Sequence, residues 1–413
     1  MAGTLPMKPM PHAHDHCNHL PGEACSAAHD SPPRLVPPPL SLYVHLPWCV
    51  RKCPYCDFNS HAVPDGKLSL DLEQQYLQAL VADFNTQLEF AQGREIHSVF
   101  IGGGTPSLIS AVGYQWLFAQ LKALLPFQDE CEITLEANPG TIEHDPFAGY
   151  LAAGINRLSI GVQSFNSDHL QKLGRIHSQS DALSAITLAR EAGFQRINVD
   201  LMHGLPEQTL EQALNDLKLA VEQGATHISW YQLTIEPNTV FFRTQPVLPV
   251  DEVLEAIQEQ GEAYLKAKGF INYEVSAWRK ERPSAHNLNY WQFGDYLAIG
   301  AGAHGKVTRP DGVYRFQKTR LPKDYLAKVP AEHGQFKRIT AEEMPFEFMM
   351  NALRLNAGVD AKLYAERTGL NLDDLAPVLT SLRQRKLLVE DANRLACTEQ
   401  GHVFLNSVLE EFL

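Results

Sequence analysis

The sequence contains no uninterrupted apolar run long enough to span a bilayer, and its N-terminus lacks the basic-then-apolar pattern of a secretory signal peptide. It also lacks an excess of positive charge. The formal net charge is −13, which gives no general attraction to nucleic acid or to anionic lipid. We therefore expect a cytoplasmic protein whose seven cysteines stay reduced and do not pair as disulfides.

The first forty residues contain no Phe, Tyr or Trp, but they contain nine prolines. Such a stretch buries too little apolar surface to offset the entropy of ordering it, so we predict a disordered tail over residues 1–40. The histidines and one cysteine of the tail suit a loosely bound transition metal, and a solvated tail with no site is the alternative. These candidate ligands are His12, His14, His16, His19 and Cys17.

After residue 40, short runs rich in β-branched residues alternate with longer helical stretches. One such stretch, residues 210–224, has apolar residues at steps of three and four and ends at a glycine. Repeated alternation predicts a parallel α/β sheet with right-handed crossovers, closed into a full or partial barrel. The expected strands are residues 41–46, 96–101, 131–136, 156–161, 196–201 and 226–233.

Polar or glycine-rich residues follow at least five of these strands. The second strand is followed by "GGGTP", the third ends in Glu136, Ala137 and Asn138, and the fifth contains Asp200. In parallel barrels the strand ends share one rim, and the chemistry collects there. This series therefore predicts a shared site at the C-terminal rim of the barrel.

Three cysteines, Cys49, Cys53 and Cys56, fall within eight positions in the loop after the first strand. Thiolate sulfur selects zinc or iron–sulfur clusters. A structural zinc site uses four ligands, usually as two separated pairs, and Cys131 and Cys397 do not provide a second pair. Three ligands on a four-iron cluster would leave one iron open to a small molecule. A zinc or purely structural site is the alternative.

The spacing Cys-x3-Cys-x2-Cys, with Tyr55 directly before the last cysteine, resembles the cluster loop of the radical S-adenosylmethionine (SAM) superfamily. The "GGGTP" at residues 102–106 resembles the glycine segment of that superfamily, where backbone approaches the methionine end of the cofactor. The resemblance covers nearly everything after residue 40. It implies a partial, TIM-like (β/α)6 barrel, a [4Fe-4S] cluster held by three cysteines with one open iron, and bound SAM.

Within the superfamily, the chain resembles the group that contains oxygen-independent coproporphyrinogen dehydrogenase and the HemW heme chaperones. This resemblance implies that Tyr43 lies near the cluster and the cofactor, that Tyr55 stacks beside the adenine, and that the polar rim residues contact the cofactor. The residues implied to bind SAM are Tyr43, Tyr55, Gly103, Gly104, Thr105, Glu136, Gln163, Arg175 and Asp200.

Two features separate the two relatives. The dehydrogenase has a fourth cysteine two positions after the third, whereas this chain has Phe58 there, which argues against porphyrinogen decarboxylation. The segment "HNLNYW" resembles the His-Asn-x-x-Tyr-Trp motif that is associated with heme binding in the HemW group. Imidazole is a good axial ligand for heme iron, and a buried aromatic turn is the alternative. The implied heme residues are His286, Asn287, Tyr290 and Trp291, with His304 as a second candidate ligand.

The last portion resembles the winged-helix arrangement that the family carries at this end. From residue 341 onward, seven Lys and Arg stand against twelve Asp and Glu, which opposes binding to nucleic-acid phosphates. The predicted organisation is a tail (1–40), a barrel (41–275), a connecting segment with the motif (276–340) and a mainly helical, winged-helix-like domain (341–413).

These patterns predict a heme chaperone that holds a [4Fe-4S] cluster and SAM and transfers heme to an acceptor protein, with a respiratory enzyme as one candidate acceptor. A homodimer and a peripheral membrane contact are compatible with the sequence. The alternatives are an oxygen-independent coproporphyrinogen III oxidase or another radical SAM enzyme. The sequence assigns no catalytic residue and leaves enzymatic activity open.

Overall fold

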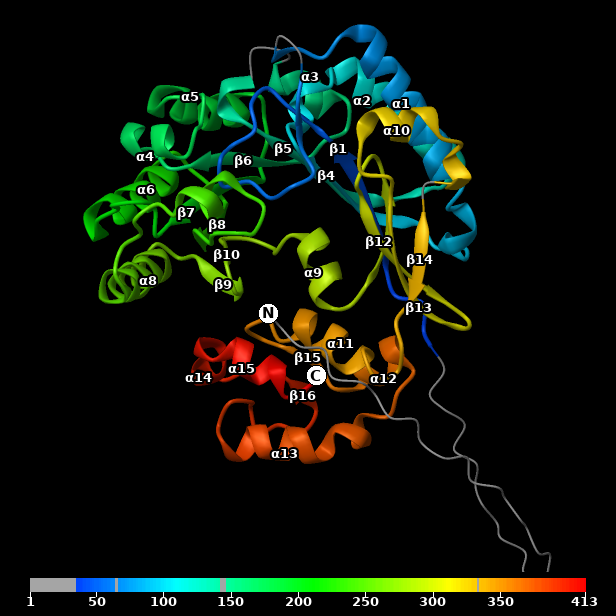
Figure 1. Cartoon of the computed structure of the whole chain (residues 1–413), viewed down its shortest axis with the longest axis vertical. Helices are drawn as coiled ribbons and strands as arrows, with labels where there is room; N and C mark the ends of the chain where they lie inside the picture. Colours follow the sequence, from blue (N-terminus) through cyan, green and yellow to red (C-terminus); the bar gives the residue numbers. More distant parts are fainter. Residues whose placement is uncertain (1–34, 64–65, 142–145, 333) are drawn as a thin grey trace, which may run out of the picture. The chain divides into compact units, whose positions relative to one another are not determined.

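The computed structural model describes residues 35–413, except 64–65, 142–145 and 333. Most of the predicted tail therefore lies outside the described residues, including its candidate metal ligands. Residues 33–413 gather into one compact unit, so the predicted boundaries at residues 275 and 340 stay predictions. Figure 1 shows a curved sheet with helices on its outer side and a group of short helices next to it.

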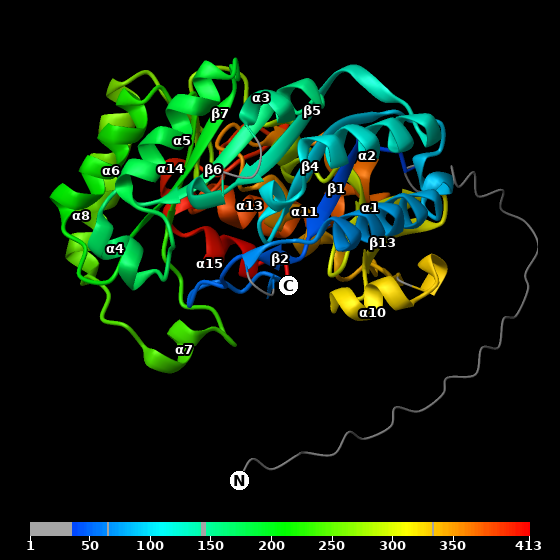
Figure 2. The same cartoon turned by 90° about the horizontal axis from the view of Figure 1, so that it is seen from above.

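Six parallel strands form the middle of a twelve-stranded sheet and confirm the predicted (β/α)6 core. All six expected strands are present and pair in chain order. Figure 2 shows the intervening helices along the outside of this sheet. The six strands are β1 (Leu40–Leu46), β4 (Ile96–Gly103), β5 (Phe127–Ala137), β6 (Arg157–Gln163), β7 (Ile197–His203) and β8 (His227–Gln232).

Several outer helices, α5 and α6 among them, begin at side-chain caps. Ser178 and Thr209 each accept a backbone N–H three residues along, and the side chains of Asp181 and Gln212 return the bond to the cap. Gly224, with φ +88°, ends the last turn of α6 as predicted. The helices between the core strands are α1 (Leu70–Asn85), α2 (Ala111–Leu124), α3 (Phe147–Ala152), α4 (Ser167–Lys172), α5 (Gln179–Glu191) and α6 (Leu210–Glu222), and α7 (Val240–Thr244) and α8 (Asp251–Ala267) follow the last core strand.

The chain after residue 270 extends the sheet at both edges, which the sequence did not predict. β10 (Ala277–Arg279) and β9 (Ile271–Glu274) add antiparallel strands beside β8. β11 (Asp295–Ile299) pairs parallel to β1, and β12 (His304–Arg309), β13 (Gly312–Gln317) and β14 (Gln335–Arg338) follow antiparallel. Between the two edges lies α9 (Ala285–Trp291), which contacts β4 and β1. A short α10 (Pro322–Ala327) precedes β14.

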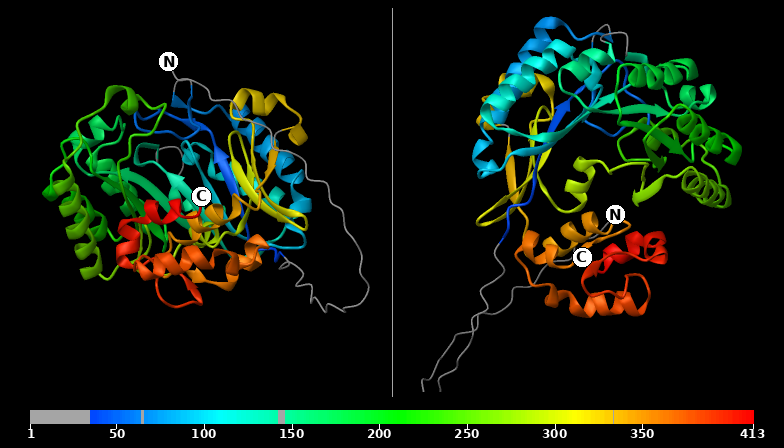
Figure 3. Two further views of the ribbon diagram at one scale, coloured as in Figure 1. Left: turned by 60° about the horizontal axis from the view of Figure 1, so that its bottom comes forward. Right: turned by 180° about the vertical axis from the view of Figure 1, so that it is seen from behind.

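The C-terminal part is mainly helical, as predicted, and Figure 3 shows it as a bundle of short helices coloured orange to red. Its small sheet pairs β15 (Val359–Asp360) with β16 (Arg394–Leu395). Phe348, Leu382 and Val408 belong to its apolar core, which also takes in Tyr273 and Phe293 from the barrel side. The helices are α11 (Met344–Ala352), α12 (Lys362–Thr368), α13 (Ala376–Gln384), α14 (Glu399–Val403) and α15 (Leu405–Glu410).

Among the residues that the structure describes, no helix is both long and apolar enough to cross a membrane.

Candidate functional site

The three-cysteine loop folds back over the glycine segment of β4. The loop begins in β2 (Trp48–Cys49), which pairs with β3 (His61–Ala62). The amides of Gly104 and Thr105 donate to the carbonyls of Leu46 and Trp48, both at 2.6 Å. A Cβ on Gly104 would lie 2.3 Å from the carbonyl oxygen of Trp48, so only glycine permits this close approach.

Burial affects the thiols of Cys49 and Cys56 in the same direction. Burial raises the pKa of the Cys49 thiol, which also forms hydrogen bonds with the side chains of Thr105 and Ser60. Burial likewise raises the pKa of the Cys56 thiol, and a negative charge on Cys49 would raise it further. A cationic metal centre reverses this penalty, because it stabilises the thiolate form. In the described part of the chain, no three His, Cys, Asp or Glu side chains already have the arrangement of a metal site.

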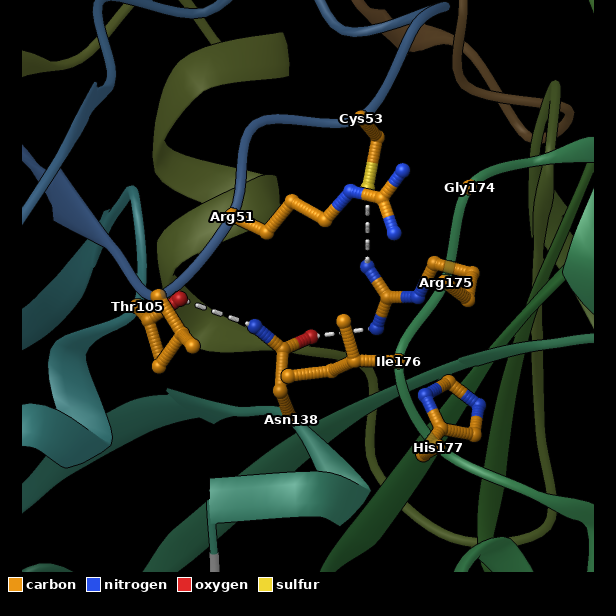
Figure 4. Close-up of a pocket in the computed structure, with 9 residues that line it drawn as sticks. Arg51, Cys53, Thr105, Asn138, Gly174, Arg175, Ile176 and His177 are labelled. Atoms are coloured by element: carbon orange, nitrogen blue, oxygen red, sulfur yellow. Dashed lines mark hydrogen bonds between the residues drawn. The ribbon is translucent and has the colours of Figure 1, made fainter. Parts of the chain in front are cut away.

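A line of polar contacts joins the glycine segment to the cysteine loop, as Figure 4 shows. Asn138 donates from Nδ2 to the Thr105 hydroxyl at 3.0 Å. Arg175 donates to Oδ1 of Asn138 at 2.5 Å and to the Gly161 carbonyl at 2.6 Å. The same guanidinium also reaches Sγ of Cys53 at 3.8 Å. These contacts border a small pocket at the strand ends, which the sequence predicted as the shared rim.

Two carboxyl groups, Glu136 and Asp200, lie on β5 and β7, on either side of β6. Glu136 accepts from the amide of Gly103 at 3.1 Å. Burial, reinforced by the neighbouring charge of Asp200, raises the pKa of Glu136 to about 8. Burial also raises the pKa of Asp200, although Ser159 and Asn198 both donate to its carboxylate, at 2.9 and 2.7 Å. The site therefore offers one carboxyl that holds its proton at neutral pH.

Three further residues predicted to bind SAM, Gln163, Tyr55 and Tyr43, each contact a different side chain. The side-chain oxygen of Gln163 accepts from the hydroxyl of Tyr231 at 2.8 Å, and its backbone is left-handed with φ +68°. Tyr55 packs against Phe241, with ring centroids 6.3 Å apart. The hydroxyl of Tyr43 forms a hydrogen bond of 2.8 Å with Nδ1 of His45. Gln163 ends β6, whereas Tyr43 and Asp200 lie in the middle of β1 and β7, so the predicted SAM residues do not all lie at strand ends.

The "HNLNYW" segment forms helix α9 and does not form a turn. Its first histidine, His286, is buried, with its ring stacked on Phe100 of β4 at a centroid distance of 4.5 Å. Phe100 also stacks on Tyr43, at 6.4 Å, so the motif lies beside a predicted rim residue. The Nδ1 atom of His286 is buried and has no hydrogen-bond partner. Burial lowers the pKa of this imidazole well below its usual value, so the ring is neutral.

A single carboxylate on β5 holds the N-terminus of α9. Oε1 of Glu132 accepts from the Ser284 hydroxyl at 3.2 Å and from the amide of Ala285 at 2.9 Å. It also accepts from the amide of His286 at 3.4 Å, while Oε2 pairs with Arg196. A negative charge at a helix N-terminus satisfies orphan N–H groups and complements the helix dipole. Glu132 therefore positions the motif, although no pattern in the sequence marks this residue.

The last two motif residues border a second pocket, between α9 and α11. The edge of Tyr290 meets Tyr296 at a centroid distance of 4.4 Å, and the guanidinium of Arg354 lies 4.3 Å from the ring of Trp291. Nε1 of Trp291 is buried without a partner. The pocket is lined by Tyr290, Trp291, Phe293, Gly294, Tyr296, Lys306, Arg315, Glu347, Met350 and Asn351.

Other candidate residues lie apart from this pocket. His304 begins β12 and is exposed, and Phe58 is 61% exposed in the cysteine loop. Asn287 does not border the pocket but donates from Nδ2 to the Tyr273 hydroxyl at 3.1 Å.

Comparison with known proteins places these features in a family. A model of the radical SAM superfamily matches residues 43–220, and one of the HemN C-terminal domain matches residues 339–404. The chain is 50% identical to the heme chaperone HemW of Haemophilus influenzae over 382 residues, which covers 91% of this chain and 98% of that protein. It is also 50% identical to HemW of Escherichia coli over 378 residues, with 91% and 98% covered.

The solved structure of coproporphyrinogen III oxidase (HemN) from Escherichia coli, described as a radical SAM enzyme, has the same fold. Its TM-score is 0.75 at 24% sequence identity, with 91% of this chain and 90% of that chain covered. At this identity the likeness establishes the radical SAM fold and does not establish the reaction.

Proposed function

The chain belongs to the HemW family of heme chaperones, and from this membership we propose that it binds heme at the α9 motif and transfers it to an acceptor protein. The observation that carries the proposal is the unpartnered Nδ1 of His286, a buried and neutral imidazole nitrogen. A buried polar atom is normally hydrogen-bonded. Because other buried histidine nitrogens also lack a partner, among them Nε2 of His402, the orphan at His286 supports a ligand only together with the motif that surrounds it. Neutral imidazole is the form that ligates heme iron.

The pocket beside α9 suits the other parts of a heme molecule. Tyr290 and Trp291 supply aromatic surface for an apolar macrocycle. Arg315 lies in the same lining and donates to Glu347 and to the hydroxyl of Tyr296. A guanidinium in this place can pair with a propionate carboxylate.

Membership of the radical SAM superfamily implies a [4Fe-4S] cluster and SAM, and the residues present fit both. We propose that Cys49, Cys53 and Cys56 hold the cluster and leave one iron open, because all three lie on the loop after β1 and a bound cation would stabilise the thiolates of Cys49 and Cys56, whose pKa values burial raises. The SAM-binding residues are those that the sequence predicted at the rim. When bound, this pair of cofactors supplies one-electron chemistry.

The acceptor in this proposal is a protein that uses heme, with a respiratory enzyme as the candidate. Phe58 stands where the porphyrinogen-decarboxylating relatives have a fourth cysteine, and it supports heme handling over decarboxylation. A homodimer stays a prediction.

An anaerobic heme titration, followed by absorption spectroscopy, tests the binding step. The cluster-reconstituted wild type is compared with His286→Ala and with His402→Ala, a control in α14. We expect a saturable Soret shift in the wild type and in His402→Ala, and at least a tenfold weaker apparent affinity in His286→Ala. No saturable binding by the wild type would remove heme carriage, and equal affinity in all three proteins would remove heme from α9.

A further inference from the structure

A continuous line of hydrogen bonds crosses the barrel interior from α9 to Asp200, in the middle of β7. Asn287 donates from Nδ2 to the Tyr273 hydroxyl at 3.1 Å, and this hydroxyl lies 3.0 Å from Nε2 of His227. On the other side of the ring, Nδ1 of His227 lies 2.6 Å from Oδ1 of Asn198. Nδ2 of Asn198 then donates to the carboxylate of Asp200 at 2.7 Å. One end of this relay is the heme motif and the other is the cofactor rim.

The three middle members of the relay are shielded from water. Their exposed fractions are 2% for Asn198, 4% for His227 and 7% for Tyr273. Leaving a buried donor or acceptor unpaired costs about 1–3 kcal/mol, so these side chains retain their partners unless another group replaces them. The relay is therefore an ordered element of the barrel interior.

The chemistry of the members fixes the direction of every bond. Oδ1 of Asn198 accepts and cannot donate, so the Nδ1 atom of His227 carries the proton. Burial and the positive charges of nearby arginines lower the pKa of His227 well below its usual value, so the ring is neutral and Nε2 is an acceptor. The Tyr273 hydroxyl must then donate to Nε2 and accept from Asn287. All donors consequently point from the motif toward Asp200.

We propose that Tyr273 and His227 are positioning residues that couple heme at the α9 motif to SAM at the barrel rim. This inference rests on the proposed function, because it takes Asp200 as a contact of SAM and α9, the helix that carries Asn287, as the helix that binds heme. In an aligned chain, each hydrogen bond polarises the next, so the bonds are stronger together than apart. A ligand that donates to Asp200 competes with Asn198, and a ligand that displaces α9 alters the bond from Asn287 to Tyr273. Occupancy of one site therefore changes the bonds that hold the other.

A linkage experiment tests the coupling on the full-length, cluster-reconstituted protein under anaerobic conditions. The heme dissociation constant is measured from the Soret band, without SAM and with saturating SAM. The variants are Tyr273→Phe, which removes one hydroxyl, and His227→Gln, which breaks the relay at the next member. Tyr264→Phe, on outer helix α8, is the matched control. Thermal unfolding of each protein shows whether it is folded.

We expect SAM to change the heme affinity of the wild type and of Tyr264→Phe by about fivefold or more, the lower end of typical coupling. In Tyr273→Phe and His227→Gln the ratio is expected to fall close to one, while each ligand still binds. Heme must also change the SAM affinity by the same factor, which isothermal titration calorimetry checks.

If SAM leaves the heme dissociation constant of the wild type unchanged, the coupling is overturned and the proposed function stays intact. A ratio preserved in both relay variants would overturn the roles of Tyr273 and His227. Absence of heme binding by the wild type would overturn the proposed function and the coupling together.

Discussion

Glu136 holds its proton at a pH where most carboxyl groups are ionised, and this makes the stability of the protein depend on pH. The pKa of Glu136 is raised to about 8 in the fold, against an ordinary value of 4.5. Between these two values the unfolded chain has lost the proton and the folded chain keeps it. The stabilising effect of this group is thus fully present below about pH 4.5 and is lost as the pH rises toward 8.

Replacing Glu136 by Gln is expected to remove this loss. One pKa unit corresponds to about 1.4 kcal/mol, and residual solvent contact reduces the total. We therefore expect the free energy of unfolding of Glu136→Gln, relative to wild type, to rise by about 2 kcal/mol between pH 5 and pH 8. Urea unfolding of the cofactor-free proteins measures this difference. The exposed Glu95→Gln serves as the control and should show no trend, and a flat difference for Glu136→Gln would contradict the assigned pKa.

At the residue scale, the sequence predicted those candidate site residues that belong to short contiguous motifs. The cysteine spacing and "GGGTP" each form a short motif, so Cys49, Cys53 and Gly104 could be found without coordinates. Asn138 was visible as a polar residue at a strand end, but its bonds to Thr105 and Arg175 join three separate loops. His227 lies in an expected strand and Tyr273 in none, and no local pattern marks either residue, because their hydrogen bond depends on a pairing across the barrel.

Helix α9 depends on one buried carboxylate for its N-terminal anchorage. Glu132→Ala removes the acceptor for the Ser284 hydroxyl and the Ala285 amide, and it leaves Arg196 without its buried partner. Breaking a buried ion pair on one side costs about 3–5 kcal/mol, so we expect a loss of unfolding free energy in this range. Denaturant titration of wild type and variant measures the loss.

Glu130→Ala is a matched control for this prediction on the same strand. Its carboxylate is 92% exposed and lies 4.0 Å from Arg282. Exposed pairs of this kind contribute about 0–1 kcal/mol, so this variant should be close to wild type. Equal losses in the Glu132 and Glu130 variants would show that the anchorage of α9 is not the source of the effect.

At the element scale, the parallel core was predictable and its extensions were not. The six core strands are short apolar runs that alternate with longer amphipathic helices, and hydrophobic periodicity is the strongest secondary-structure signal in a sequence. Helix α9 spans seven residues, too few to establish a helical period. β11 spans only five residues, and the sequence did not predict it. Its structure depends on its pairing with β1.

For the whole molecule, the fold is shared with a coproporphyrinogen III oxidase, and Phe58 stands where the resemblance implies a fourth cysteine in that group of enzymes. We expect reconstituted protein, given reductant, SAM and coproporphyrinogen, to form no protoporphyrinogen at a catalytic rate. Absorption and fluorescence of the oxidised porphyrin products measure this. Restoring the fourth cysteine as Phe58→Cys is the informative companion variant. Catalytic turnover by the wild type would contradict the chaperone account.

The most direct test of that account is the rate of heme delivery. Heme-loaded protein is mixed with membranes from heme-deficient cells that carry an apo-respiratory enzyme, and the appearance of the holo-enzyme is followed by its spectrum. The passive release rate is measured separately by capture with apomyoglobin. We predict that the acceptor fills faster than passive release allows, and faster than from free heme at the same concentration. Filling at the passive rate, or equally fast from free heme, would contradict a chaperone role.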